Sequence, residues 1–278
     1  ATVLLGTLYP LILDALGQGK VSVGPPYFNA VFVPLMVPVL FLLGVAPLTA
    51  WRRASGGELQ SRLCWPLLAA VCVGPVLVFA YEELRWPAVL ACVLAVWIVL
   101  MSIAHLRVRG LSLQAMGMSL AHVGVAIGII GIGMVTAFER EQTLTMKAGE
   151  SAAVLGFQLQ FKGIVEEPGP NYSAVRGRVA VLRGDRVVAE LFPEKRIYHA
   201  SKMPMTESAI DYGLFGDLYV VLGDPLSLDT WTLRVFFKPF IGWIWGGALT
   251  MALGGLLAAL ARRWQSVEGV EGVKGMAP

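Results

Sequence analysis

The sequence predicts a polytopic α-helical membrane protein with an inserted extracytoplasmic β-rich domain. Only 15% of its 278 residues are charged and 56% are hydrophobic, whereas soluble domains carry about 25% charged residues. Several apolar runs have the length of about 20 residues that a membrane-spanning helix needs. One segment, residues 139–238, breaks this pattern, because it is rich in charge and alternates between polar and apolar residues.

Residues 1–138 are predicted to form transmembrane helices. The first run, 1–17, opens inside an apolar stretch without Met, so we expect a truncated helix there. Full spans are then expected at 30–50, 63–81, 86–105 and 112–137. The loop GKVSVGPPYFNAVF (19–32) has two interpretations, an interfacial turn or a re-entrant element that lines a cavity.

Residues 139–238 are predicted to form a β-rich domain. This segment contains 12 Lys and Arg and 13 Asp and Glu residues, a balance that favours exposure to water. Strand-like alternation occurs at 143–147, 157–161, 178–183, 186–191 and 231–237. Gly184-Asp185 separates two of these runs and is typical of a two-residue hairpin turn. The stretch 205–215 is expected to form a short helix, with Thr206 as its N-cap.

The chain is predicted to end in a last transmembrane helix, 239–264, and a disordered tail, 265–278. Orientation follows from the cations in short loops. One set of helix ends carries eight of them, Arg52, Arg53, Arg62, Arg107, Arg109, Arg262, Arg263 and Lys274. This side is predicted to be cytoplasmic, together with the tail, and the β domain to be periplasmic. The net charge of +3 and the lack of a basic stripe give no reason to expect nucleic acid as a partner.

His122 is the candidate site residue, because it lies within an uncharged run from Leu111 to Phe138. It is roughly 15 Å along the expected helix, where ionisable side chains are costly and usually functional. Small residues above and below it on its helix face leave room for a broad, flat ligand such as a porphyrin. Histidine commonly holds haem iron. The residues alone leave a ligand, an interhelical hydrogen bond and a proton relay open.

The other two histidines are expected to be unremarkable surface residues. His105 comes near a helix end, two residues before Arg107, where its ring is expected to reach water. His199 lies in a polar loop of the β-rich segment. Neither is expected at the depth of His122, so a second haem ligand would have to come from outside this chain.

Several stretches in this order resemble the C-terminal portion of the bacterial cytochrome c maturation haem lyase membrane subunit, the CcmF family. They include GTLYPLILDALGQGKVSVGPPYFNAVFVPLM (6–36), LAHVGVAIGIIGI (120–132) and GPNYSAVRG (169–177). Further matching stretches are PEKRIYHASKMPMTESAID (193–211), DLYVVLGD (217–224) and VFFKPFIGWIWGGALTMALGG (235–255). The resemblance covers the chain up to about Arg263.

The resemblance implies a multi-pass protein of the bacterial inner membrane that helps attach haem to the CxxCH thiols of apocytochrome c. It also implies a membrane haem b, shared with the N-terminal part of the same lyase, with His122 as one axial ligand to the iron. Quinol is a possible reductant. Partners implied in this way are a haem chaperone that delivers the haem, apocytochrome c, other cytochrome c maturation membrane subunits and the lipid bilayer.

The sequence also departs from the family pattern. The tryptophan-rich motif, the two periplasmic histidines for the substrate haem and the other membrane ligand have no counterpart here, so we do not expect this chain alone to be an active enzyme. Tyr172, Glu194, Lys195 and Arg196 are candidate docking residues for a partner, with a solvated charged face as the simpler interpretation. The alternative functions are a non-catalytic scaffold or transporter half, with a structural or proton-relay His122, and a respiratory electron-transfer subunit.

Overall fold

The computed structural model describes residues 2–19, 24–48, 56–80, 85–184, 186–227 and 229–274. The chain forms two compact units. Unit 1 comprises Ala1–Val76, Val93–Ala126 and Leu249–Pro278, and unit 2 comprises Leu77–Cys92 and Ile127–Ala248.

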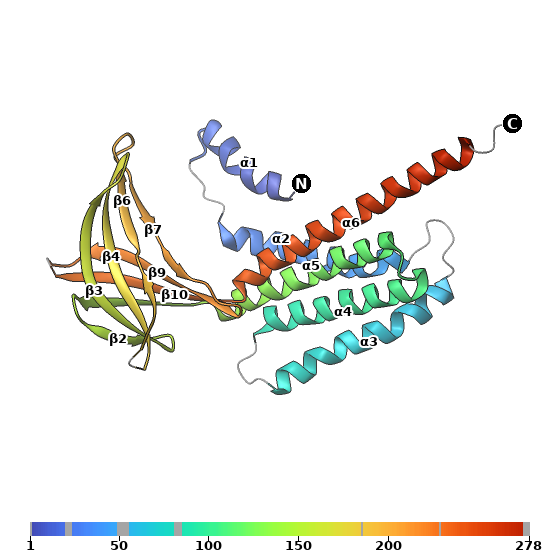
Figure 1. Cartoon of the computed structure of the whole chain (residues 1–278), viewed down its shortest axis with the longest axis horizontal. Coiled ribbons are helices and arrows are strands. Elements are labelled where there is room, and N and C mark those ends of the chain that lie inside the picture. The colour runs from blue at the N-terminus through green and yellow to red at the C-terminus, as the bar shows by residue number, and fades with distance from the viewer. Residues whose placement is uncertain are drawn as a thin grey trace. The chain divides into compact units, whose positions relative to one another are not determined.

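The helices in the described part of the chain account for the apolar runs. They are α1 (Thr2–Ala15), α2 (Pro25–Val45), α3 (Gly56–Ala80), α4 (Trp86–Arg109), α5 (Leu113–Phe138) and α6 (Ile241–Lys274), with a 3₁₀ turn, η1 (Ala46–Leu48), after α2 (Figure 1). Five of them are long and apolar enough to cross a membrane, at Asn29–Leu48, Arg62–Phe79, Trp86–Arg109, Leu113–Phe138 and Ile241–Arg263. These spans agree with the predicted ones to within a few residues.

The prediction of a loop over 19–32 is wrong from Pro25 onward. Helix α2 begins there, with Pro25 and Pro26 at its first two positions and Gly24 as its N-cap. Proline suits these positions, because its missing N–H has no partner in the first turn and its φ is already helical. Residues 20–23 lie outside the described residues.

In unit 1, α2 and α4 are joined through Trp97. The indole Nε1 donates a hydrogen bond to the carbonyl oxygen of Phe41 at 2.9 Å, and the two rings stack with centroids 4.9 Å apart. A side chain at Gly44 would collide with the same indole. Trp97 is therefore buried with its one polar atom satisfied, as a buried indole requires.

Glycines bring α5 and α6 into backbone contact. In unit 1, a Cβ on Gly117 would lie 2.6 Å from the backbone nitrogen of Ala258, and one on Gly254 would lie 2.6 Å from the carbonyl oxygen of Gly117. In unit 2, a Cβ on Gly131 would lie 2.9 Å from the nitrogen of Ile244. Small residues at such positions let helices in lipid approach closely.

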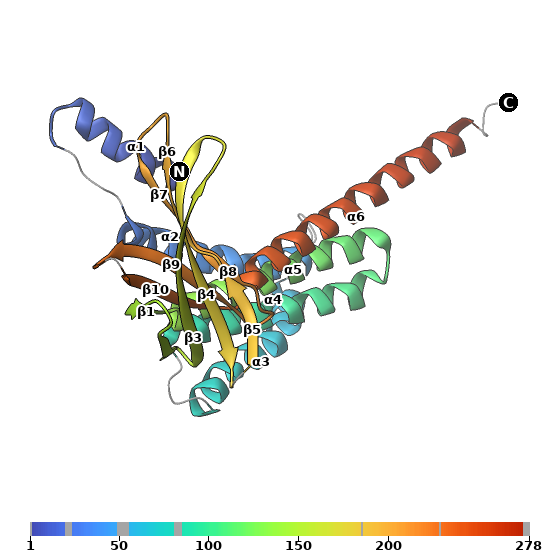
Figure 2. The same cartoon turned by 60° about the vertical axis from the view of Figure 1, so that its left-hand side comes forward.

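The β domain in unit 2 consists of two antiparallel sheets. One has the order β1-β10-β9-β8, from β1 (Arg140–Lys147), β8 (Ala209–Asp211), β9 (Gly216–Pro225) and β10 (Thr230–Pro239). The other has the order β2-β3-β4-β6-β7, with β5 also paired to β4; its strands are β2 (Ser151–Val154), β3 (Phe157–Pro168), β4 (Tyr172–Arg183), β5 (Arg186–Leu191), β6 (Glu194–Tyr198) and β7 (Pro204–Glu207). In both views β9 and β10 run across the direction of β3 and β4 (Figures 1 and 2).

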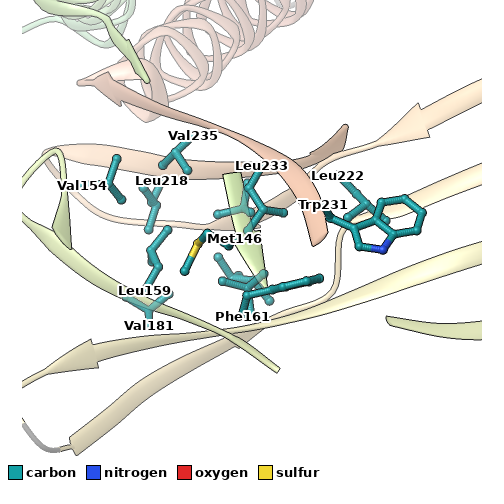
Figure 3. Close-up of a cluster of buried hydrophobic side chains, with 13 residues drawn as sticks. Met146, Val154, Leu159, Phe161, Val181, Leu218, Leu222, Trp231, Leu233 and Val235 are labelled. Carbon is teal, nitrogen blue, oxygen red and sulfur yellow. The ribbon is translucent and has the colours of Figure 1, made fainter. Parts of the chain in front are cut away.

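The core of the β domain lies between these sheets. Side chains of the two sheets point toward one another (Figure 3). Leu159, Phe161 and Val181 come from the larger sheet, and Leu233 and Val235 from the smaller one; all five are buried. The predicted alternation is confirmed, because the inward residues of each strand occupy every second position.

Every predicted strand is found, and so is the predicted hairpin. Arg183 pairs with Arg186 across the turn at Gly184. The φ of Gly184, 62°, lies in the left-handed region that favours glycine. Asp185 lies outside the described residues. The fold class, a polytopic helical membrane protein with an inserted β-rich domain, is confirmed. The side of the membrane on which the domain lies stays a prediction.

Two local predictions are wrong. Residues 205–215 form no helix, because β7 pairs with β6 and β8 pairs with β9, and these sheet contacts outweigh a weak local helix signal. The predicted end of the last helix at residue 264 is too early, because α6 continues to Lys274; disorder of the tail stays a prediction. This extension contains Gln, Glu and Lys, which favour helices, and no proline.

The glycine contact between α5 and α6 can be tested with two adjacent glycines. We expect Gly254→Leu to separate the helices and lower the unfolding temperature of the full chain in detergent, since its Cβ has no room. Gly255→Leu is the matched control, because a Cβ there meets nothing within 4 Å. Equal unfolding temperatures for the two variants, measured by circular dichroism, would contradict the contact.

Candidate functional site

His122 lies on α5, and a hydrogen bond of its ring indicates which ring nitrogen carries the proton. Its Nδ1 is 2.8 Å from the carbonyl oxygen of Met118, one turn earlier in the same helix. A carbonyl oxygen only accepts hydrogen bonds, so Nδ1 must carry the proton and donate it. In the neutral imidazole the lone pair is then on Nε2, at the far side of the ring, and this is the tautomer that a metal ligand needs.

The ring of His122 is half-buried, and its bond to Met118 is its one hydrogen bond within the described residues. It therefore makes no hydrogen bond to another described helix. An interhelical hydrogen bond, one of the alternatives that the residues left open, is thus not found for His122 within the described residues.

Two of the small residues on the His122 side of α5 take part in helix packing. In unit 1, the Ser119 hydroxyl donates to the carbonyl oxygen of Ser102 on α4 at 3.4 Å. In unit 2, a Cβ on Gly133 would fall on the side chain of Ala91 and lie 3.0 Å from the carbonyl oxygen of Pro87. These contacts bring α4 close to α5 at Ser119 and at Gly133. Space for a flat ligand beside the His122 ring itself stays a prediction.

His105 differs most from its prediction. Its side chain on α4 is buried and does not reach water. Nδ1 lies 3.1 Å from the carbonyl oxygen of Pro47 in η1, and so carries the proton. Nε2 is buried without a hydrogen-bond partner among the described residues. No local sequence pattern signals this contact, because Pro47 is 58 residues away. His105 and His122 are close enough to interact electrostatically.

His199 is exposed, as predicted, with Nε2 3.3 Å from the Ser173 hydroxyl. Among the described residues no group of three or more His, Cys, Asp and Glu side chains is placed to hold a metal ion. If His122 holds a metal, it does so without such a cluster, and the second ligand is a separate residue.

The charged cluster of the β domain is joined by its own ion pairs. Glu194 on β6 is only 5% exposed, and its carboxylate accepts hydrogen bonds from Arg176 and Arg196 at 2.5 and 2.8 Å. Burial acts to raise the pKa of Glu194, but the bonds from Arg196 and Arg176 outweigh it and hold the pKa below its ordinary value of 4.5. Glu194 therefore offers no accessible surface to a partner.

The remaining candidate docking residues keep part of their side chains exposed. The Arg196 guanidinium lies over the ring of Tyr172 at 4.7 Å, and Tyr172 packs edge-on against Tyr198 with ring centroids 5.5 Å apart. Lys195 forms an ion pair with Asp224 and lowers the pKa of that carboxyl. Tyr172 and Arg196 therefore share one face of the sheet, whereas Lys195, which pairs with Val175, lies on the opposite face and is not brought together with them.

Glu194→Gln should destabilise the full chain by about 1–3 kcal/mol at neutral pH, because two guanidinium groups lose an ionised acceptor. A carboxyl with a lowered pKa stabilises the fold above its unfolded pKa, and this contribution disappears as pH falls through the lower folded value. We therefore expect the difference between wild type and variant to shrink below pH 4.5. Calorimetric unfolding at several pH values measures this stability difference, and the exposed Glu166→Gln serves as control. A stability difference that grows in acid would contradict the stabilising role of the Glu194 carboxylate.

Comparison with known proteins gives a consistent result along the chain. The family model described as CcmF C-terminal beta-sandwich matches residues 137–239. The cytochrome c-type biogenesis protein CcmF of Pseudomonas fluorescens is 39% identical over 274 residues, which cover 95% of this chain and 42% of that protein. CcmF of Escherichia coli strain K12 is 36% identical over 269 residues, with the same coverage of both chains.

A solved structure described as cytochrome c heme lyase CcmF has the same fold. It superposes with a TM-score of 0.76 at 25% identity and covers 92% of this chain and 42% of that chain. The chain thus spans less than half the length of the relatives that it matches. Sequence, β-sandwich and membrane helices agree, and over nearly its whole length the chain matches the C-terminal portion of the CcmF proteins.

Proposed function

We propose that the chain is the part of a cytochrome c haem lyase that supplies one axial ligand, His122, to a haem b in the membrane. In this role it takes part in attaching haem to the CxxCH thiols of apocytochrome c, together with the N-terminal part of the lyase. Support comes from relatives that are named as cytochrome c-type biogenesis proteins and from a related structure described as a heme lyase.

The observation that carries this proposal is the state of the His122 ring. Met118 fixes the proton on Nδ1, so Nε2 presents a lone pair from a half-buried ring in a membrane-spanning helix. Such a ring is oriented before any ligand binds, which lowers the entropic cost of coordination. Haem held there would supply one-electron chemistry, with quinol as a candidate donor of the electrons.

The competing function, a scaffold in which His122 is structural, has less support. A structural histidine in a membrane helix is expected to form a hydrogen bond to a neighbouring helix. The one hydrogen bond of His122 within the described residues stays within α5. A proton-relay role would need no fixed tautomer. The defined Nδ1–H therefore favours the ligand.

A visible spectrum tests the ligand assignment. The chain is coexpressed with the N-terminal part of a CcmF relative, and the complex is purified. We expect His122→Ala to lose most of the b-type Soret absorbance per protein, because Nε2 is removed, while the exposed His199→Ala retains it. A His122→Ala complex with the wild-type spectrum and haem content would refute the assignment.

We also propose that the β domain lies on the periplasmic side and that its Tyr172–Arg196 surface contacts the haem chaperone or apocytochrome c. The partly exposed Tyr172 and Arg196 support this, because they lie in contact on one face of neighbouring strands. The predicted cytoplasmic location of eight cations at the opposite helix ends supports the orientation.

A photo-crosslinking side chain at position 172 should join the chain to one of these partners in a membrane preparation that contains both. The control places the same side chain at the exposed Val187 on β5. Crosslinks that form equally well from both positions, or from neither, would speak against this docking surface.

A further inference from the structure

A groove in unit 2 lies between the turn that joins β8 to β9 and the first turns of α6. It has a volume of about 410 Å³ and is lined by Ile210, Tyr212, Gly213, Asp217, Tyr219, Ile241, Gly242 and Trp245. Its wall contains three aromatic rings and one acidic group, and no basic side chain. An electron-rich wall of this kind attracts a cation, since ammonium groups bind to aromatic faces and pair with carboxylates.

Asp217 supplies the charge. Its side chain is only 4% exposed, and Oδ1 accepts a hydrogen bond from the Gly213 N–H at 3.0 Å. Within the described residues Oδ2 has no hydrogen-bond donor and the carboxylate has no ion-pair partner. A buried carboxylate without a counter-ion is costly, so a cation in the groove would compensate it.

Tyr219 shows that the wall already attracts cations. The Lys238 ammonium lies 5.3 Å from the centroid of the Tyr219 ring. Lys238 stands opposite Asp217 in the register of β9 and β10, but its ammonium forms its ion pair with Glu139, at 3.1 Å, and none with Asp217 within the described residues. Burial, followed by the Asp217 carboxylate, raises the pKa of Tyr219, so the phenol stays neutral and adds no charge of its own.

The groove lies where a lipid head group would be. The turn before β9 is fixed to the start of α6, because the Phe240 N–H and the Trp243 Nε1–H donate to the carbonyl oxygens of Phe215 and Leu214, each at 3.0 Å. Helix α6 crosses the membrane from Ile241. Tyr212, Leu214, Phe215 and Trp245 are between 62% and 77% exposed around this point, and such residues are typical of the membrane–water interface.

We propose that this groove binds the ammonium head group of a membrane phospholipid, with Asp217 as its counter-ion and Tyr219 and Trp245 as its aromatic wall. The lipid then holds the β8–β9 turn at the bilayer surface. This site is separate from the chemistry proposed for His122.

Native mass spectrometry of the full chain tests the proposal, with phosphatidylethanolamine and phosphatidylglycerol of identical acyl chains as probes. We expect wild type to retain phosphatidylethanolamine about tenfold better, the factor that corresponds to a difference of about 1.4 kcal/mol. Asp217→Asn keeps an oxygen for the Gly213 N–H and should abolish this preference. Gly242→Leu should also abolish it by filling the groove, because a Cβ at Gly242 meets nothing within 4 Å and so leaves the fold intact.

Gly255→Leu is the control, as a leucine at an equally open position farther along α6, and it should keep the wild-type preference. Equal retention of the two lipids by wild type, or an unchanged preference in both Asp217→Asn and Gly242→Leu, would overturn the proposal. Displacement of the lipid by an equal concentration of soluble phosphoethanolamine would overturn the assignment to a membrane lipid.

Discussion

The close contact of α5 with α6 is the constraint on which the inserted domain depends. Apolar side chains gain little from leaving lipid, so helices in a membrane associate through packing and need small residues to approach. A Cβ on Gly131 would lie 2.9 Å from the Ile244 nitrogen and 3.0 Å from the Phe240 carbonyl oxygen, so glycine lets the returning chain approach this closely. The chain then leaves α5 as β1 and returns as β10, and these two strands pair from Arg140↔Phe237 to Lys147↔Thr230. The pairing of the two helices thus continues directly as the pairing of two strands.

This continuity satisfies the backbone where the chain leaves the apolar segment. Unpaired N–H and C=O groups are costly near hydrocarbon, and here the ladder of β1 with β10 begins two residues after Phe138. Glu139 and Lys238 form an ion pair at the same level, 3.1 Å apart. The β-sandwich is therefore held at both of its chain ends by one local set of contacts.

The two membrane histidines show how backbone carbonyl groups determine what an imidazole can do. Both His105 and His122 have Nδ1 directed at a carbonyl oxygen, and both therefore carry the lone pair on Nε2. They differ in surroundings, because His105 is buried by this chain and His122 is half-exposed. Only His122 presents its lone pair where a ligand from outside the described residues can approach, which is consistent with its proposed role.

The sequence by itself determined the number and place of the membrane spans and the β-rich insertion, and it singled out His122 as a candidate, because these follow from local hydrophobicity, period and the cost of burying a polar ring. Only the tertiary structure decided how polar groups find partners. Pro47 reaches His105, Arg176 reaches Glu194, and Ser119 on α5 bonds to Ser102 on α4. Such pairings join residues far apart in the chain, so no local pattern could have specified them. The strands over 204–211 have the same origin, since they exist only because β6 and β9 lie beside them.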